Sequence, residues 1–196
     1  MEIEPKHLHT LLEHVRQCQH CAPELPQPPR PILQAHPQAR ILIAAQAPGR
    51  LAHERGRPFA DPSGDRLRQW LGVSTEQFYD PELFALVPMG FCYPGKGRAG
   101  DLPPRPECAA RWRAPLLGQL TQVQLTLVLG QYARRYHLPG SPGTLQEQVR
   151  CWQQHWPAAL LLPHPSPRNT LWLRRNPWFA AEILPVLRAR VREILS

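Results

Sequence analysis

Four short apolar segments constrain the fold of this chain more than any other feature of its sequence. Each is a continuous apolar run rather than an alternating one, which is typical of strands buried on both faces of a parallel sheet. Most of them end close to proline or glycine, residues that interrupt strands and begin turns. The predicted strands are Arg40–Ala45, Leu83–Val87, Gln124–Leu129 and Ala158–Leu162.

Helices are predicted between these strands. Leucine and valine recur with helical spacing over His7–Cys18, and Asp61 and Gly72 are residue types that begin and end helices. Strands that alternate with helices predict an α/β fold: a three-layer α/β/α sandwich with a central, mainly parallel four-stranded sheet. The other predicted helices are Cys108–Leu120, Gln131–Tyr136, Thr144–Trp152 and Trp172–Ser196, the last of them open to an interruption at Asn176–Pro177.

The turns that follow the strands are the expected ligand site. In an open parallel sheet, ligands bind beyond the carboxyl ends of the strands. The loop after the first predicted strand continues to about residue 60, and residues 93–107 are predicted as an exposed basic loop. The turns expected to meet at one edge of the sheet are residues 46–49, 88–92, 130–131 and 163–169.

Length and charge narrow the possible functions. We expect residues 1–196 to form a single domain, because this length is enough to bury one core. A net charge of +8 and an isoelectric point near 9.8 favour a polyanionic partner, nucleic acid first and an anionic membrane surface second. No apolar stretch is long enough to cross a membrane, and the N-terminus lacks a signal peptide, so a cytoplasmic location is expected.

The segment His164–Asn169 carries three polar side chains directly after the last predicted strand. The prolines around it exclude a helix and stiffen the backbone. Such a loop can hold the imidazole of His164, the hydroxyl of Ser166 and the guanidinium of Arg168 at fixed distances from a ligand. A proline-rich surface turn is the alternative interpretation.

Five cysteines, an odd number in a reducing compartment, favour metal ligands or free thiols over disulfides. Cys18 and Cys21 form a C-x-x-C pair just past the first predicted helix. Alone, this pair fits a redox couple, a zinc site or coincidence.

Together these motifs resemble the uracil-DNA glycosylase superfamily. Ala45–Gly49 followed by Gly56–Phe59 is similar to the GEAPG and GxPF motifs of the iron–sulfur (family 4) glycosylases. The sequence HPSPRN at His164–Asn169 resembles the loop of the single-strand-selective monofunctional branch. The resemblance covers most of the chain, roughly Leu8 to Asn176.

The resemblance implies two catalytic residues and a base-binding set. His164 would donate a hydrogen bond to a uracil oxygen as negative charge develops there. Gln46 would hold the pyrimidine edge or the attacking water, next to Ala47. Phe59 would stack on a base extruded from the DNA. The structural alternatives are a core aromatic for Phe59 and a satisfied structural histidine for His164.

The same resemblance implies DNA contacts from the HPSPRN loop. Ser166 would bind a phosphate that flanks the flipped nucleotide, although a purely turn-forming hydroxyl fits equally. Arg168 would fill the emptied stack, which a planar guanidinium can do while pairing with phosphate. Arg174 and Arg175 are further candidates for phosphate contacts, or else part of a solvated helix face.

Four of the cysteines fall where the iron–sulfur family places its cluster ligands: Cys18, Cys21, Cys92 and Cys108. The resemblance therefore implies a 4Fe–4S cluster with a structural role, which would clamp the N-terminal helix to the loop after the second strand. A tetrahedral zinc ion or free thiols fit the same four residues.

The sequence also departs from the family patterns. Ala47 stands where the best-known branch has a water-activating aspartate, and the nearest carboxylate, Glu54, is expected to form a loop salt bridge. Pro88–Phe91 lacks the asparagine that reads uracil in several branches. These differences suggest a dissociative mechanism that depends on His164 and Gln46, or weak or altered activity.

Three functions are compatible with these residues. The first is a monofunctional DNA glycosylase that hydrolyses uracil or a related deaminated base from DNA and leaves an abasic site. By analogy, we expect it to be a monomer. No lysine lies in the motifs to form a Schiff base. The second is a non-catalytic module that binds damaged or single-stranded DNA. The third is a small hydrolase of a nucleotide-like metabolite, against which the basic charge counts.

Overall fold

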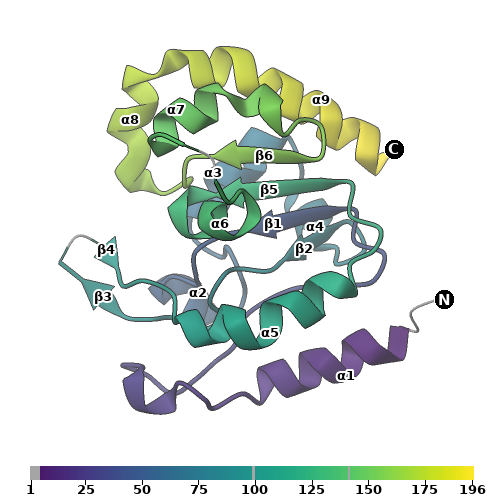
Figure 1. The fold of residues 1–196 in the computed structure, drawn as a ribbon, viewed down its shortest axis with the longest axis vertical. Coiled ribbons are helices and arrows are strands. Elements are labelled where there is room, and N and C mark those ends of the chain that lie inside the picture. Colours follow the sequence, from purple (N-terminus) through teal and green to yellow (C-terminus); the bar gives the residue numbers. More distant parts are fainter. Residues whose placement is uncertain (1–4, 99, 141) are drawn as a thin grey trace.

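A four-stranded sheet lies at the centre of the molecule (Figure 1). The computed structural model describes residues 5–98, 100–140 and 142–196. The sheet contains β1 (Ile41–Ala44), β2 (Phe84–Leu86), β5 (Leu125–Leu129) and β6 (Ala159–Leu162). Its spatial order is β2-β1-β5-β6, and every neighbouring pair is parallel. The four predicted strands are confirmed, each within two residues at either end.

Two hydrophobic cores lie on opposite faces of this sheet. Ile41 and Ile43 pack into a core that includes α3 and α9, whereas Leu42, between them, packs into a core shared with α1 and α5. This division follows from the strand geometry, because successive side chains point to opposite faces. The three-layer α/β/α arrangement is therefore confirmed. These longer helices are α1 (Pro5–Arg16), α3 (Pro62–Leu71), α5 (Pro106–Gly118) and α9 (Leu184–Leu195).

The sequence patterns missed the short helices Arg50–Arg55 and Thr75–Tyr79, whereas the helices predicted at Gln131–Tyr136 and Thr144–Trp152 are confirmed within two residues. The shorter helices are α2 (Arg50–Arg55), α4 (Thr75–Tyr79), α6 (Gly130–His137), α7 (Leu145–Arg150) and α8 (Thr170–Arg175). α2 lies where a loop was predicted; Arg50 pairs with Glu54 one turn later at 2.5 Å, which supports the helix and matches the salt bridge expected for Glu54. α4 begins with a capping box that involves Ser74 and Gln77.

The C-terminal helical segment Trp172–Ser196 is interrupted at Asn176–Pro177, the break that the sequence suggested. α8 ends at Arg175, and a π-helical turn over Phe179–Ile183 precedes α9. The break follows from Pro177, which has no N–H to continue the helix, and from the side chain of Asn176, which donates to the carbonyl of Trp172 at 2.9 Å.

The two helices next to the cysteines have different boundaries from those predicted. α1 stops at Arg16, two residues before Cys18, so Cys18 lies in the following loop. α5 begins at Pro106 rather than at Cys108, because proline is favoured at the first helical position. Cys108 is therefore in the first turn of α5, where its side chain faces the N-terminal segment.

The predicted ends of α3 are confirmed. The carboxylate of Asp61 accepts the backbone N–H of Gly64 at 2.9 Å, which caps the first turn. Gly72 ends the helix in the left-handed conformation (φ 71°), which glycine adopts without strain. This cap places Asp61 at the carboxyl edge of the sheet.

The basic segment 93–107 is not only an exposed loop. It contains a small antiparallel hairpin, β3 (Lys96–Gly97) and β4 (Gly100–Asp101), and its Tyr93 is buried. Figure 1 shows the hairpin projecting from the main body of the molecule, on the side toward which β6 points. The hairpin therefore stands at the edge where the ligand site is expected.

Candidate active site

A pocket of about 370 Å³ lies at the carboxyl edge of the sheet. This volume falls within the usual range of small-molecule sites, about 300–1,000 Å³. The pocket is built by the loops after β1 and β6, which flank the end of β5, and by the hairpin. All six residues predicted for catalysis, base binding and DNA binding line it: Gln46, Ala47, Phe59, His164, Ser166 and Arg168.

His164 is held in one tautomer by its own loop. The backbone N–H of Ser166 donates to its Nδ1 at 3.2 Å, so in the neutral ring the proton is on Nε2. Burial lowers the pKa of His164, and the charge of Asp61 only partly opposes this shift. Gly130 (φ 76°) lets the chain turn beside the Cβ of His164. The pocket therefore contains a neutral imidazole with a defined donor.

Gln46 is fixed by contacts that sequence patterns did not indicate. Its Nε2 donates to the carbonyl of Leu102 at 3.0 Å, and its own carbonyl accepts the N–H of Gly90 at the same distance. The side chain thus ties the loop after β1 to the segment after the hairpin. Ala47, beside it, offers only a methyl group and its main chain to the pocket.

Phe59 combines the two interpretations given from the sequence. Its ring lines the pocket, and it also packs edge-on against Phe78 of the core, with centroids 6.0 Å apart. Its backbone has a positive φ of 54°, uncommon for a residue with a side chain. A Cβ on Gly64 would overlap the carbonyl of Phe59, so glycine there allows this close approach.

Ser166 forms part of its own turn. Its Oγ accepts the N–H of Arg168 at 3.3 Å, as in the turn-forming alternative. Its carbonyl accepts from Arg66 of α3 at 2.9 Å, and Arg66 also reaches Thr170 Oγ1 at 3.1 Å. Arg66 thus holds the loop to the body of the protein, a role that no local sequence signal revealed.

Two carboxylates also line the pocket, Asp61 and Asp101. Asp61 was predicted only as a helix cap, and Asp101 lay in a segment predicted as a basic loop. The guanidinium of Arg168 lies against Gly100, at a point that a side chain on Gly100 would occupy. The hairpin therefore forms one wall of the pocket and brings an acid into it.

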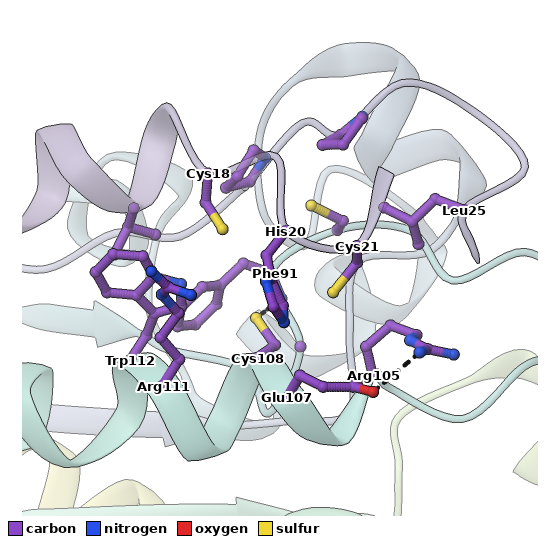
Figure 2. Close-up of a pocket in the computed structure, with 15 residues that line it drawn as sticks. Cys18, His20, Cys21, Leu25, Phe91, Arg105, Glu107, Cys108, Arg111 and Trp112 are labelled. Atoms are coloured by element: carbon purple, nitrogen blue, oxygen red, sulfur yellow. Dashed lines mark hydrogen bonds and ion pairs between the residues drawn. The ribbon is translucent and has the colours of Figure 1, made fainter. Parts of the chain in front are cut away.

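A second pocket gathers the four predicted metal ligands. Cys18, Cys21, Cys92 and Cys108 all line it. Figure 2 shows the sulfur atoms of Cys18, Cys21 and Cys108 directed toward a shared space beside Arg105. Within the described ranges, no three His, Cys, Asp or Glu side chains are grouped closely enough to hold a single metal ion.

Hydrogen-bond donors surround these thiols. The N–H of Phe91 donates to Cys108 Sγ at 3.4 Å, and a hydrogen bond from the backbone of Arg30 favours the thiolate of Cys92. Burial nevertheless dominates, and it raises the pKa of Cys92 to about 11 and that of Cys108 to about 12. Burial also raises the pKa of Cys21, with the side chain of Arg105 opposing the shift. The thiols of Cys21, Cys92 and Cys108 are therefore protonated at neutral pH unless a metal replaces the protons.

Comparison with protein families matches residues 34–188 to the uracil DNA glycosylase superfamily. This match covers more than three quarters of the chain. The chain belongs to the uracil DNA glycosylase superfamily. Its fold is thus that of DNA glycosylases that act on uracil or damaged bases, and the membership implies a DNA substrate.

The region that matches the superfamily includes all predicted residues of the first pocket but only two of the four cysteines of the second. The matched region contains every predicted residue of the first pocket, together with Cys92 and Cys108. Cys18 and Cys21 precede it, on the segment that follows α1. The superfamily match therefore leaves open both the family 4 resemblance and the cluster. In the part of the chain that is described, no helix has the length and apolar character needed to cross a membrane.

One buried cation of this glycosylase fold was not expected from the sequence. Arg113 of α5 is fully buried and donates to the carbonyls of Val87 and Pro88, both at 2.9 Å. Its Nη2 also contacts Nε2 of His137. Burial lowers the pKa of Arg113 to about 10, and burial with the charge of Arg113 lowers that of His137 to about 3. Arg113 therefore anchors the backbone between β2 and the pocket.

Proposed function

We propose that this protein is a monofunctional DNA glycosylase that hydrolyses the N-glycosidic bond of uracil, or of a related deaminated base, and leaves an abasic site. The observation that carries the proposal is the neutral imidazole of His164, with its proton on Nε2, in a pocket shared with Gln46 and Phe59. Among the described residues that line this pocket, none is a lysine, which supports simple hydrolysis without a Schiff base.

His164 is proposed to stabilise the departing base. When the bond between the sugar and the base breaks, the base leaves as an anion whose charge is shared by its oxygens. A preorganised donor aimed at such charge lowers a barrier by about 3–4 kcal/mol. A neutral imidazole suits this task because Nδ1 accepts the N–H of Ser166, which leaves the Nε2–H directed as a donor to the base.

Phe59 and Gln46 are proposed to hold the extruded base, with Ala47 against its edge. Base flipping costs a few kcal/mol, which stacking and hydrogen bonds in a pocket offset. The ring of Phe59 is fixed against Phe78, and the amide of Gln46 is fixed by Leu102, so both are positioned before the base arrives.

Ser166 and Arg168 are proposed to contact the DNA around the flipped nucleotide. The guanidinium of Arg168 is placed at the pocket wall by the hairpin, where it can fill the gap in the stack or pair with a phosphate. In the turn, the Oγ of Ser166 accepts the N–H of Arg168. The hydroxyl hydrogen of Ser166 could therefore donate to a phosphate without breaking this hydrogen bond.

We further propose that the four cysteines hold a 4Fe–4S cluster. Such a cluster takes one thiolate on each iron, so its ligands stand farther apart than around a single zinc ion. Four cysteines that line one pocket without forming a single-ion group fit the cluster better than zinc. The cluster would supply a covalent link between the segment after α1, the loop after β2, and α5.

Replacing Cys108 with serine tests this structural role. We expect a lower melting temperature and loss of the visible absorbance of anaerobically purified protein, because one of four ligands is removed. Folded variant protein should still release base. Cys151→Ser, at an exposed cysteine outside the pocket, is the control. A Cys108→Ser protein that keeps its melting temperature and loses only turnover would contradict the structural role.

The glycosylase proposal is tested by base release from uracil-containing single- and double-stranded oligonucleotides. We expect free uracil and an abasic, uncleaved strand. Hypoxanthine- and xanthine-containing strands are run beside them, since Pro88–Phe91 lacks the asparagine that reads uracil in several branches. Binding of these strands without release of any base would contradict the enzyme and support a DNA-binding module of the same fold.

A further inference from the structure

The hairpin β3–β4 is attached to the pocket at two points. Gln46, from the loop after β1, donates to the carbonyl of Leu102, the residue that directly follows β4. Leu102 in turn donates to the carbonyl of Gly95 at 2.8 Å, which closes the base of the hairpin. At its other end, Gly100 lies against the guanidinium of Arg168. The carboxylate of Asp101, between these points, is thereby held at the pocket.

Asp101 and Asp61 meet above the loop after β1. Their Oδ2 atoms lie 3.5 and 3.6 Å from the point where a side chain on Gly49 would begin. The two carboxylates therefore approach the same point beside Gly49, and the lack of a side chain on this glycine leaves that point open. They come from separate elements, the hairpin and the N-terminal cap of α3.

The proposed reaction needs a carboxylate at this position. As a glycosidic bond breaks, the sugar gains oxocarbenium character and positive charge, which a nearby anion stabilises. A water must then add to the same carbon and lose a proton. Ala47 has no group for either task. Among the described residues that line the pocket, the acids are Asp61 and Asp101.

Asp101 suits this role better than Asp61. Asp61 uses Oδ1 to cap α3 by accepting from Gly64, so it is committed to the helix. Asp101 lines the pocket and is exposed to solvent. The hairpin sets the position of the Asp101 carboxylate. Unlike that of Asp61, this position does not depend on capping a helix.

We propose that Asp101 is the carboxylate that faces the sugar and accepts the proton of the attacking water. This inference rests on the proposed glycosylase function. The bond between the sugar carbon and the base nitrogen breaks, and its electron pair leaves with the base. The water oxygen then bonds to the sugar carbon, and the water proton passes to Asp101 and on to solvent. The base anion takes a proton from solvent, which completes hydrolysis.

The charges around Asp101 set the pH range of this role. Burial and the neighbouring charge of Asp61 raise the pKa of Asp101, whereas Arg168 and Lys96 lower it, and the net shift is upward. Tyr93 also faces this carboxylate and is neutral at physiological pH, since its own pKa is raised. Because the ionised carboxylate is the active form, the rate should rise with pH through the raised pKa of Asp101.

The test compares the single-turnover rate of base release by the wild type and by Asp101→Asn, which keeps the shape of the side chain. We expect a loss of about 100-fold, the usual contribution of a positioned general base, with a change in oligonucleotide Kd of less than about threefold. Asp65→Asn, on the exposed face of α3, is the matched control and should keep the wild-type rate. Thermal melting checks that each variant is folded.

Two readouts separate chemistry from a structural role of Asp101. The rise of rate with pH in the acid range should be present in the wild type and absent from Asp101→Asn. Added formate, a small carboxylate, should raise the rate of Asp101→Ala and leave Asp65→Ala unchanged. An active wild type whose Asp101→Asn variant stays within threefold, or keeps the same pH profile, would overturn this inference alone. A wild type that releases none of the tested bases would overturn the proposed function as well.

Discussion

Replacing His164 with alanine is expected to lower the rate of base release about 100- to 1,000-fold, because a single preorganised donor to developing negative charge contributes this much. Binding of the oligonucleotide should change little, since most of that affinity comes from phosphate contacts. The measurement is single-turnover release of uracil beside a filter-binding titration of the same oligonucleotide.

His9→Ala is the control for this experiment, because His9 is 72% exposed on α1, lies outside the pocket and contacts Glu13. Retention of more than a tenth of the wild-type rate by His164→Ala would contradict the proposed role. The pH profile gives a second check. Because the pKa of His164 is lowered and the neutral ring is the active form, its protonation should reduce the rate only below the usual histidine range.

Replacing Arg113 with alanine is expected to lower the free energy of unfolding by about 3–5 kcal/mol. The substitution leaves the buried carbonyls of Val87 and Pro88 without their donor and opens a cavity under α5. Urea denaturation followed by circular dichroism measures this change. Because Pro88 lines the pocket, the Michaelis constant for the oligonucleotide should also rise.

Two variants make the Arg113 experiment specific. Arg113→Met fills most of the space, so it should restore the part of the unfolding free energy that Arg113→Ala loses to the cavity. It should still be less stable than the wild type by about 1–3 kcal/mol for each carbonyl left without a donor. Arg192→Ala, at an exposed position of α9, should stay within about 0.5 kcal/mol of the wild type. An Arg113→Ala protein as stable as Arg192→Ala would show that these hydrogen bonds contribute nothing.

The half-buried His137 beside Arg113 makes stability depend on pH. Its pKa is lowered to about 3 in the folded protein, so the unfolded chain binds a proton that the folded one does not. Its contribution to stability is complete above about pH 6.5, the ordinary pKa of histidine, and is lost as the pH falls from there toward 3.

The strands and the first pocket follow from local patterns in the sequence. Continuous apolar runs such as Ile41–Ala44 can be satisfied only by burial on both faces, which fixes strands, a parallel sheet and helices on either side. Parallel strands place all their carboxyl ends at one edge, so the loops with Gln46 and His164 were expected to meet, and both line the same pocket.

Other residues of the pocket could not be predicted in this way. β3 and β4 each contain only two residues, too few to show a periodic pattern, and their position depends on distant contacts with Gln46 and Arg168. Asp101 therefore reaches the pocket through tertiary structure alone. Arg113 was missed for a related reason, because a charged residue on a helix is normally exposed.

The sequence by itself determined the elements and the edge of the sheet where the site lies, because burial and turn chemistry act over a few neighbouring residues. Only the tertiary structure decided the strand order β2-β1-β5-β6, the contact of Arg66 with the loop after β6 and the placement of Asp101 beside Asp61. Each of these depends on contacts between segments far apart in the chain, whose energies are not encoded in any local pattern.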